Sequence, residues 1–345
     1  MDTPRNVLVF RFSALGDVAM TIPVVRQVLD QYPELHIHFV SNKAFAPLFK
    51  GIDRLHFYPA DLKGEHKGVT GLFRLFRELR HAAKPDALAD LHQVLRTKVL
   101  RFYFGVAGIR VAVLHKGREE RAALTRKNDK VLAQLPSMTS RYAEVFHHLG
   151  LPVELDEHYI PLNIRDKKDT NKGTVRLIGI APFAKHPEKM YPEGKMKEVI
   201  AALSAEDNIQ ILLFGGGPAE TAQLEAWEKA YPNVRSMAGK STLDEELRTI
   251  ASLDLMISMD SANMHLASLV GVKVISIWGA THPFAGFYGW GQDPANAVQA
   301  DLFCRPCSVF GNKTCYRGNR ECMQLITPGS IVAKVIALTR QTAGL

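Results

Sequence analysis

The sequence has no long hydrophobic run and no recognisable targeting segment. No stretch approaches the roughly 18 consecutive apolar residues that a membrane-spanning helix requires. Residues 1–6 lack the basic-then-apolar layout of a secretory signal. We therefore expect a cytoplasmic protein. Its 345 residues, 46% of them hydrophobic and 23% charged, fit two globular domains of ordinary size.

Cysteine is scarce, and all four cysteines lie close together, at Cys304, Cys307, Cys315 and Cys322. Four such thiols could hold zinc or an iron–sulfur cluster. Their spacing does not match a standard pair of zinc knuckles, and a cytosolic chain is not expected to depend on disulfides. The sequence leaves open whether they bind a metal, pair or stay free, and we predict no metal at the functional site.

A dinucleotide-binding fingerprint is also missing. Neither candidate first turn carries the three glycines of G-x-G-x-x-G with an acidic residue about 20 positions further on. The run Gly215-Gly-Gly-Pro218 does not match that motif, and a tight turn explains it equally well. An NAD-dependent oxidoreductase therefore stays an alternative only.

Positive charge is concentrated in one segment. The formal net charge is +8, and residues 61–130 alone hold 16 Lys and Arg against 8 Asp and Glu. Such a segment suits an anionic partner, namely nucleic acid, anionic lipid or a phosphorylated glycan, although a solvated helical face explains it as well. Within it, basic and apolar residues alternate at helical spacing over residues 63–84, which predicts a basic amphipathic helix able to touch a membrane surface.

Short apolar runs alternate with amphipathic segments along the whole chain, a pattern typical of parallel sheets flanked by helices. The expected strands span 6–12, 35–40, 54–58, 87–91, 109–114, 175–181, 209–214, 255–259 and 272–277. The expected helices span 17–29, 68–83, 138–149, 193–204, 218–230, 243–252, 265–271 and 331–339. A polar, charged stretch at 156–172 is the best linker.

Polar residues at the predicted strand ends are the candidate functional groups, because open α/β sheets bind ligands at that edge. Asp17 follows the first strand at a helix start, where an acidic residue is also favoured for structural reasons. Lys185, His186 and Lys189 lie on the loop after strand 175–181, and Glu220 follows the glycine run. Asp260, Ser261 and His265 follow strand 255–259, and Gly279 and Thr281 follow strand 272–277.

Taken together, five motifs in this order resemble glycosyltransferase family 9, the ADP-heptose:lipopolysaccharide heptosyltransferases. Ser13-Ala-Leu-Gly-Asp-Val18 resembles the family's S-x-G-D-[IV], and Lys189-Met-Tyr-Pro192 resembles K-[RH]-W-P. Gly215-Gly-Gly-Pro-Ala-Glu220, Asp260-Ser-Ala-Asn-Met-His265 and Gly279-Ala-Thr-x-Pro283 resemble its nucleotide-sugar motifs. Met190, Tyr191 and Ala262 depart from the family pattern.

The resemblance implies a GT-B fold, with two Rossmann-like, doubly wound domains facing a central cleft. The predicted acceptor-binding domain spans 1–170 and the nucleotide-sugar domain 174–327, with a helix in 328–345 that could pack back on the first domain. It implies Asp17 as general base and Lys189 as the partner of the donor phosphates. The implied donor-binding residues are Ala184, Lys185, Gly216, Glu220, Ser241, Asp260, Ser261, Ala262, His265 and Thr281. The implied acceptor-binding residues are Ser13, Gly16, Lys63, Lys67, Arg118 and Arg121.

The function implied is inverting, metal-independent transfer of a heptose or related sugar. The donor is an ADP-sugar, which is a co-substrate rather than a cofactor. The acceptor is lipopolysaccharide core or another lipid-linked anionic glycan, reached by a monomer peripheral to the inner face of the cytoplasmic membrane. The alternatives are a GT-B enzyme using another nucleotide sugar, a sugar-nucleotide epimerase, or a basic RNA-binding module. We expect no nucleic-acid partner, because RNA binding gives no reason for the polar residues at the strand ends.

Overall fold

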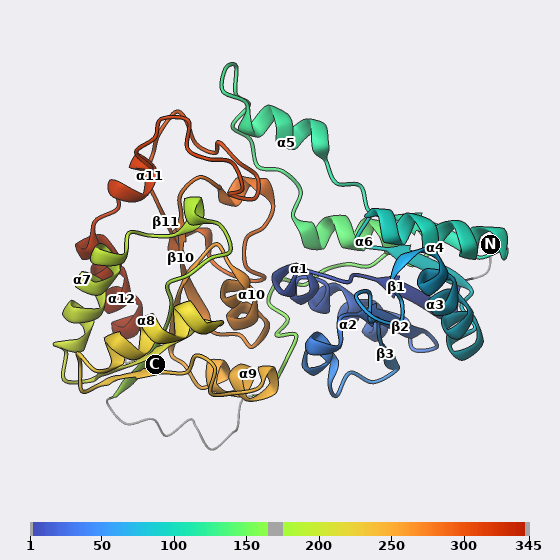
Figure 1. Cartoon of the computed structure of the whole chain (residues 1–345), viewed down its shortest axis with the longest axis horizontal. Coiled ribbons are helices and arrows are strands. Elements are labelled where there is room, and N and C mark those ends of the chain that lie inside the picture. The colour runs from blue at the N-terminus through green and yellow to red at the C-terminus, as the bar shows by residue number, and fades with distance from the viewer. Residues whose placement is uncertain (1–2, 165–174, 342–345) are drawn as a thin grey trace. The chain divides into compact units, whose positions relative to one another are not determined.

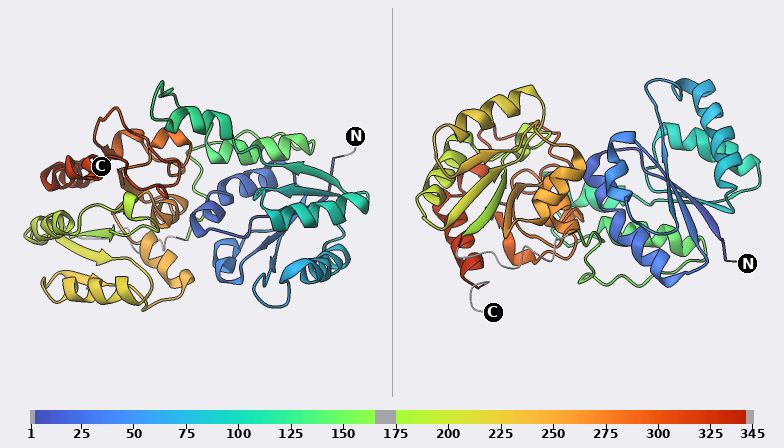
Figure 2. Two further views of the ribbon diagram at one scale, coloured as in Figure 1. Left: turned by 45° about the horizontal axis from the view of Figure 1, so that its top comes forward. Right: turned by 90° about the horizontal axis from the view of Figure 1, so that it is seen from below.

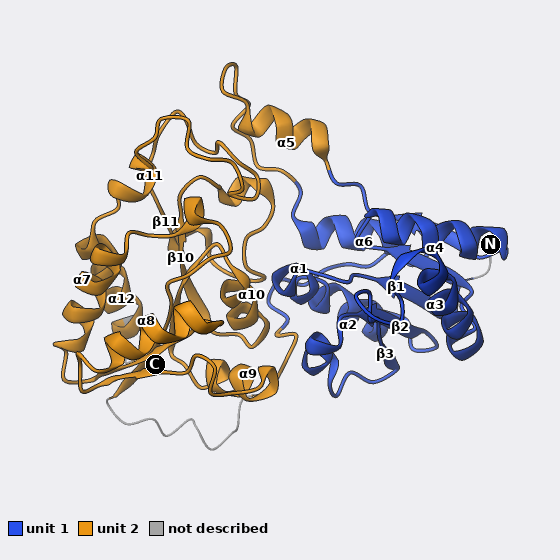
Figure 3. Ribbon diagram, viewed as in Figure 1, with its two compact units in different colours: residues 1–116, 136–159 blue, residues 117–135, 160–345 orange. Residues whose placement is uncertain are grey.

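The computed structural model describes residues 3–164 and 175–341, and these form two compact units (Figure 3). The first unit comprises Met1–Lys116 and Pro136–Tyr159, and the second comprises Gly117–Leu135 and Ile160–Leu345. Residues 165–172 of the linker expected at 156–172, and the boundary expected between 170 and 174, lie outside the described residues.

The first unit is built on a five-stranded parallel sheet in the order β3-β2-β1-β4-β5 (Figure 1). Its strands are β1 (Asn6–Phe10), β2 (His36–Ser41), β3 (Leu55–Pro59), β4 (Ala87–Asp90) and β5 (Arg110–Val113). Its α-helices are α1 (Leu15–Ala19), α2 (Ile22–Gln31), α3 (Gly68–Ala83), α4 (Leu95–Val106) and α6 (Met138–His148). Sheets of this kind are covered on both faces, which explains why β1 is buried from Val7 to Phe10 and β4 is buried throughout (Figure 2).

Helices α3 and α4 pack side by side over one face of this sheet. Leu8 and Phe10 of β1 contribute to a core in which α3 buries Leu72, Leu75, Phe76 and Leu79, and α4 buries Leu100 and Phe104. The α3 residues recur every three or four positions, so they form one stripe on the helix. The helix predicted at 68–83 is confirmed with the same bounds and is basic and amphipathic, whereas Lys63 and Lys67 of the predicted pattern precede it.

The second unit holds a six-stranded parallel sheet in the order β11-β10-β9-β6-β7-β8. Its strands are β6 (Arg176–Ala181), β7 (Ile209–Leu213), β8 (Val234–Ser236), β9 (Leu255–Met259), β10 (Lys273–Trp278) and β11 (Ala297–Gln299). Its α-helices are α5 (Arg118–Thr125), α7 (Glu193–Ser204), α8 (Pro218–Glu228), α9 (Leu243–Ala251), α10 (Ala262–Leu269), α11 (Glu321–Gln324) and α12 (Pro328–Gln341). Among the described residues, no helix is both long enough and apolar enough to cross a bilayer.

Two segments lie elsewhere than the sequence suggested. The C-terminal helix α12, which we expected to pack back on the first domain, packs on α7 and β10 of the second unit instead, because Ile331 and Val335 join that unit's core. Residues 117–135, expected within the first domain, belong to the second unit. The Leu135 N–H donates to the carbonyl of Phe284 at 2.9 Å, which fixes the end of this arm there.

Three histidines gather on β2 and β3. His38 is 5% exposed, its ring nitrogens lie 3.2 Å from the Tyr58 hydroxyl and 3.2 Å from Asn6 Oδ1, and its ring stacks on His56 at 4.9 Å. Burial first, and then the neighbouring His56 and His36, lower the pKa of His38 to about 4 from its ordinary 6.5. The folded state therefore holds this imidazole neutral at pH values where the unfolded chain would protonate it.

Acid should destabilise the first unit through this group. Between pH 6.5 and about 4 the unfolded state binds the extra proton, so His38 lowers the free energy of unfolding as pH falls, by up to about 1.4 kcal/mol per pH unit. Urea titrations over this range should show a shallower pH slope for His38→Gln than for the parent. His147→Gln, at an exposed position on α6, is the control. An equal slope in parent and His38→Gln would contradict the assignment.

Candidate functional site

In the second unit, the order of the strands creates a topological switch point. Strand β6 pairs with β7 on one side and with β9 on the other. After β6 the chain continues to β7, whereas after β9 it continues to β10 in the opposite direction along the sheet. The loops after β6 and β9 therefore separate at the carboxyl edge of the sheet, the place where open α/β sheets bind ligands. Lys189 follows β6 and Asp260 follows β9.

Lys189 and Asp260 form an ion pair at this switch point. The ammonium lies 2.8 Å from Asp260 Oδ2, and the two side chains are 15% and 7% exposed. Ser261 is the N-cap residue of α10 in an extended conformation, and its hydroxyl lies 3.1 Å from that of Ser258. Asp260 directly precedes this N-cap residue, so the ammonium that it holds is near the start of α10, an arrangement that favours a bound anion.

The departures from the family motifs fit this local structure. Ala262 is the first residue of α10 and has no positive φ, so a side chain is tolerated where the family has glycine. Tyr191 is buried, and its hydroxyl donates to the Ile326 carbonyl at 2.8 Å. The aromatic residue after Lys189 therefore anchors the loop in the core of the second unit.

Three of the predicted donor residues, namely Asp260, His265 and Thr281, are buried rather than presented at the surface. His265 is 6% exposed on α10, and Thr281 is 1% exposed after β10. The Thr281 hydroxyl is buried and has no hydrogen-bond partner among the described residues. At Gly279 an added Cβ would lie 2.6 Å from Met323 Cε and 3.1 Å from the Glu188 carbonyl, so only glycine fits against the Lys189 loop.

The remaining donor candidates lie on loops after β6, β7 and β8. Glu220, in the first turn of α8, accepts a hydrogen bond from the Gly216 N–H at 2.9 Å. Ala184 is partly exposed and Lys185 is exposed on the loop after β6, while Ser241 directly precedes Thr242, the N-cap residue of α9. These residues share the carboxyl edge with Lys189 and Asp260.

The cysteine-rich segment, residues 303–322, supports this edge, a role that the sequence did not reveal. The guanidinium of Arg305 is buried and donates to the carbonyls of Gly279, at 2.6 Å, and Thr281, at 3.0 Å. Gly311, at φ +73°, packs so closely on the Lys189 stem that an added Cβ would lie 2.3 Å from Lys189 Cγ. Arg320 donates to the Pro187 carbonyl at 3.1 Å.

The four cysteines of that segment are free thiols. Burial raises the pKa of Cys322 to about 11 and also raises that of Cys307. Over residues 3–164 and 175–341, no three His, Cys, Asp or Glu side chains are placed to hold a metal ion. The visible contribution of this segment is to hold the Lys189 and Gly279 loops.

In the first unit, Asp17 lies at the corresponding switch point. Strand β1 pairs with β2 and β4, and Asp17 stands in the first turn of α1 just after β1. Its Oδ2 lies 2.7 Å from the guanidinium of Arg11 and accepts a hydrogen bond from the Ala14 N–H at 3.2 Å. The Asp17 side chain is 28% exposed, whereas that of Arg11 is 8% exposed. A partly exposed carboxylate is therefore held by a buried cation.

His92, on the loop after β4, is a neighbour that the sequence analysis missed. Its Nδ1 accepts from the Phe12 N–H at 3.4 Å, while Arg11 donates to the Leu91 carbonyl at 2.9 Å. Burial first, and then the cations of Arg11 and Lys116, lower the pKa of His92 to about 3. This imidazole is thus neutral beside Asp17. Only the order of the strands, which brings β4 next to β1, could have revealed it.

The predicted acceptor residues are scattered. Ser13 and Gly16 lie next to Asp17, with Ser13 exposed. Lys63 and Lys67 are exposed on the loop between the edge strand β3 and α3. Arg118 and Arg121 lie on α5 of the second unit, whereas the other four belong to the first unit. Arg121 is 7% exposed, with its guanidinium 4.7 Å from the centroid of the Phe287 ring, which is a structural position.

Comparisons with known proteins point in one direction. The family model described as glycosyltransferase family 9 (heptosyltransferase) matches residues 72–315, a span that begins after the Asp17 motif. Lipooligosaccharide heptosyltransferase 2 of Campylobacter jejuni is 29% identical over 95% of this chain and 96% of its own length.

Two solved structures share the fold. A glycosyltransferase family 9 protein from Veillonella parvula superposes with a TM-score of 0.73 at 18% identity, over 99% of this chain and 98% of its own. The E. coli heptosyltransferase WaaC with ADP-2-deoxy-2-fluoro heptose superposes with a TM-score of 0.68 at 19% identity, over 96% and 98%. The predicted GT-B class is thereby confirmed. Since the family model covers well over half of the sequence, this chain is a glycosyltransferase and belongs to glycosyltransferase family 9.

Proposed function

We propose that this protein transfers a heptose from ADP-heptose to a lipid-linked glycan acceptor of the lipopolysaccharide core, with inversion at the anomeric carbon. Two observations support this choice of substrates. The similar proteins of known function are named as heptosyltransferases acting on lipopolysaccharide or lipooligosaccharide. One similar structure carries an ADP-heptose analogue.

Asp17 is the proposed general base. As the acceptor hydroxyl attacks the anomeric carbon its proton becomes acidic, so even a carboxylate held by Arg11 can take it late in the step. Arg11 orients the carboxylate, with its guanidinium 2.7 Å from Asp17 Oδ2. Neutral His92 adds no positive charge of its own beside the carboxylate.

The donor diphosphate is assigned to Lys189 and the N-terminal N–H groups of α10. As the bond to the sugar breaks, negative charge grows on the leaving diphosphate, and a fixed ammonium near a helix N-terminus stabilises that charge. Glu220 is assigned to the ribose hydroxyls, and Ala184, Lys185, Gly216 and Ser241 border the nucleotide. Asp260, Ser261, Ala262, His265 and Thr281 shape the phosphate end.

The observation that carries this proposal is the Lys189–Asp260 pair at the switch point of β6 and β9. The test is release of ADP from ADP-heptose by the purified protein with lipopolysaccharide core lacking heptose, followed by mass spectrometry of the glycan. Addition of one heptose mass supports the proposal. Turnover of the nucleotide sugar without acceptor would instead indicate an epimerase, and persistence of turnover in EDTA would support metal independence.

We further assign a peripheral association with the membrane that carries the acceptor, and a monomeric state. The acceptor lipid is anchored in a bilayer, so an enzyme acting on its glycan works at that surface. The acceptor side is assigned to Ser13, Gly16, Lys63 and Lys67, whose backbone and ammonium groups suit phosphates and acidic sugars. Arg118 remains a candidate from the second unit.

Gly311→Ala should weaken donor binding without touching the donor. An added Cβ collides with Lys189 Cγ and Cδ, at 2.3 and 2.5 Å, so the lysine must move from its place beside Asp260. We expect the Kd for ADP, measured by calorimetry, to rise on the order of tenfold, the loss of one charge-assisted interaction. Gly318→Ala is the matched control, because Gly318 has φ +77° but no atom within 4 Å of its Cβ position. Equal Kd values for the two variants would refute the support role of residue 311.

A further inference from the structure

The outer side of α4 carries an apolar stripe that the fold of the first unit does not use. Leu95, Phe102 and Val106 are 77%, 66% and 75% exposed, and they recur at helical intervals on one side of the helix. Its opposite side buries Leu100 and Phe104 in the core. Large side chains so exposed lie in water at a free-energy cost that only a further contact can recover.

The stripe continues onto α3 through aromatic contacts. Phe73 of α3 is 47% exposed, and its ring meets that of Tyr103 of α4 edge-on at 5.4 Å. The Tyr103 ring lies 6.1 Å from that of Phe102. The two helices thus present one joined surface. We call it the α3–α4 surface, defined by its exposed apolar residues Phe73, Leu95, Phe102 and Val106 and the basic residues beside them.

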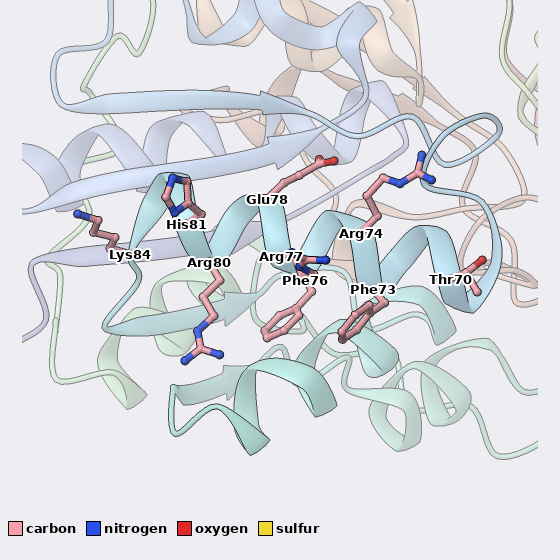
Figure 4. Close-up of a pocket in the computed structure, with 9 residues that line it drawn as sticks. All are labelled: Thr70, Phe73, Arg74, Phe76, Arg77, Glu78, Arg80, His81 and Lys84. Atoms are coloured by element: carbon pink, nitrogen blue, oxygen red, sulfur yellow. The ribbon is translucent and has the colours of Figure 1, made fainter.

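Positive charge surrounds this apolar strip. Six exposed basic residues lie on the two helices and their ends: Arg74, Arg77, Arg80, Lys84, Arg96 and Lys98. Helix α4 has no acidic residue, and the one acidic residue of α3, Glu78, pairs with His66 at 3.1 Å. In Figure 4, Phe73, Phe76 and Arg80 point to one side of α3 while Glu78 and His81 point to the other, and all five line a hollow of about 810 Å³.

An anionic bilayer matches both properties at once. Aromatic and aliphatic side chains enter the boundary between headgroups and acyl chains, while Arg and Lys bind the lipid phosphates, each near-surface cation adding about 1 kcal/mol. A second copy of the chain would bring like charges together on the two α3–α4 surfaces. A nucleic acid would use the cations but leave Leu95 and Val106 without a partner.

We propose that the α3–α4 surface docks the protein on anionic phospholipid, with Phe102 and Val106 inserted below the headgroups and Arg77 and Arg80 on lipid phosphates. The inference rests on the proposed function in one respect, since the acceptor of that reaction is anchored in a membrane. It assigns the surface to the lipid around the acceptor rather than to the acceptor glycan.

Vesicle flotation of the full chain tests the proposal. The parent should float with vesicles of phosphatidylcholine and phosphatidylglycerol, and not with phosphatidylcholine alone. Phe102→Ser/Val106→Ser and Arg77→Gln/Arg80→Gln should each lower the apparent affinity for the anionic vesicles by on the order of tenfold. Phe303→Ser, at a side chain 77% exposed in the second unit, and Lys229→Gln/Lys273→Gln are the matched controls and should float like the parent.

Unchanged flotation of both α3–α4 variants would overturn the docking assignment, and so would equal flotation of the parent with neutral vesicles. A third contradicting result is a parent dimer in sedimentation velocity that Phe102→Ser/Val106→Ser converts to monomer. Turnover with a deacylated, water-soluble acceptor separates this inference from the reaction itself. The α3–α4 variants should keep the parent's turnover on that acceptor. Absence of turnover in every protein, with flotation as expected, would reject the proposed function and keep the docking surface.

Discussion

Asp17→Asn should reduce heptose transfer by about 10²–10⁴-fold, the range that a positioned general base contributes. The amide keeps the size of the side chain but cannot take the proton of the attacking hydroxyl. The affinity for ADP should stay within a factor of about two, because the groups assigned to the nucleotide all lie in the second unit. Initial rates of ADP release and calorimetry of ADP binding measure the two effects separately.

A structural effect of this substitution is distinguishable from a chemical one. Buried Arg11 loses its ionised partner in the variant, so some loss of thermal stability is expected. Arg11→Lys keeps a cation near Asp17 and should retain much more turnover than Asp17→Asn. Asp53→Asn, at an exposed position of the first unit, should behave like the parent. Turnover of Asp17→Asn near the parent level would remove Asp17 as the base.

Lys189→Ala is the second substitution with a large expected effect. It deletes the ammonium assigned to the diphosphate and leaves the carboxylate of Asp260, 7% exposed, without its ion-pair partner at 2.8 Å. In the variant the donor diphosphate approaches the unpaired Asp260 carboxylate, whereas in the parent it approaches an ion pair with no net charge. We expect kcat/KM for the donor to fall about 10²–10³-fold, comparable to the loss of one charge-stabilising group elsewhere, with both a higher KM and a lower kcat.

The ion pair provides an internal control for that result. Lys189→Ala/Asp260→Asn removes the unpaired carboxylate as well, so it should recover part of the donor affinity that Lys189→Ala loses. Lys185→Ala, on the same loop but at an exposed position, should lower the donor affinity much less than Lys189→Ala does. An unchanged donor affinity in Lys189→Ala, or a double variant weaker than the single one, would exclude the phosphate role of Lys189.

Most of the secondary structure was predictable from local pattern, and the exceptions have physical causes. Helices 68–83 and 193–204 and strand 255–259 agree with the structure residue for residue. Helix α4 was missed because its exposed side also carries the apolar residues Leu95, Phe102 and Val106, so its sequence does not show one apolar and one polar face. Strands β8 and β11 were missed because each has 3 residues, too few to show a period.

The candidate site was predictable as a set of residues but not as a set of contacts. The resemblance named Asp17, Lys189 and Asp260, since each belongs to a contiguous motif. It did not reveal the contact of Gly311 with Lys189, because glycine has no side chain that would mark it as a candidate. It did not reveal the contact of Arg11 with Asp17, because these residues belong to separate elements. His92 and Arg305 escaped notice for the same reason.

The sequence by itself determined the alternation of strands and helices, the polar residue at each strand end and the family to which the chain belongs. All three depend on residues close together in the chain, whose spacing sets their local conformation. The tertiary structure alone decided that β9 lies next to β6, and with it that Lys189 faces Asp260, and that residues 117–135 join the second unit. Strand order and segment docking depend on burial summed over many distant side chains, and no single motif encodes that sum.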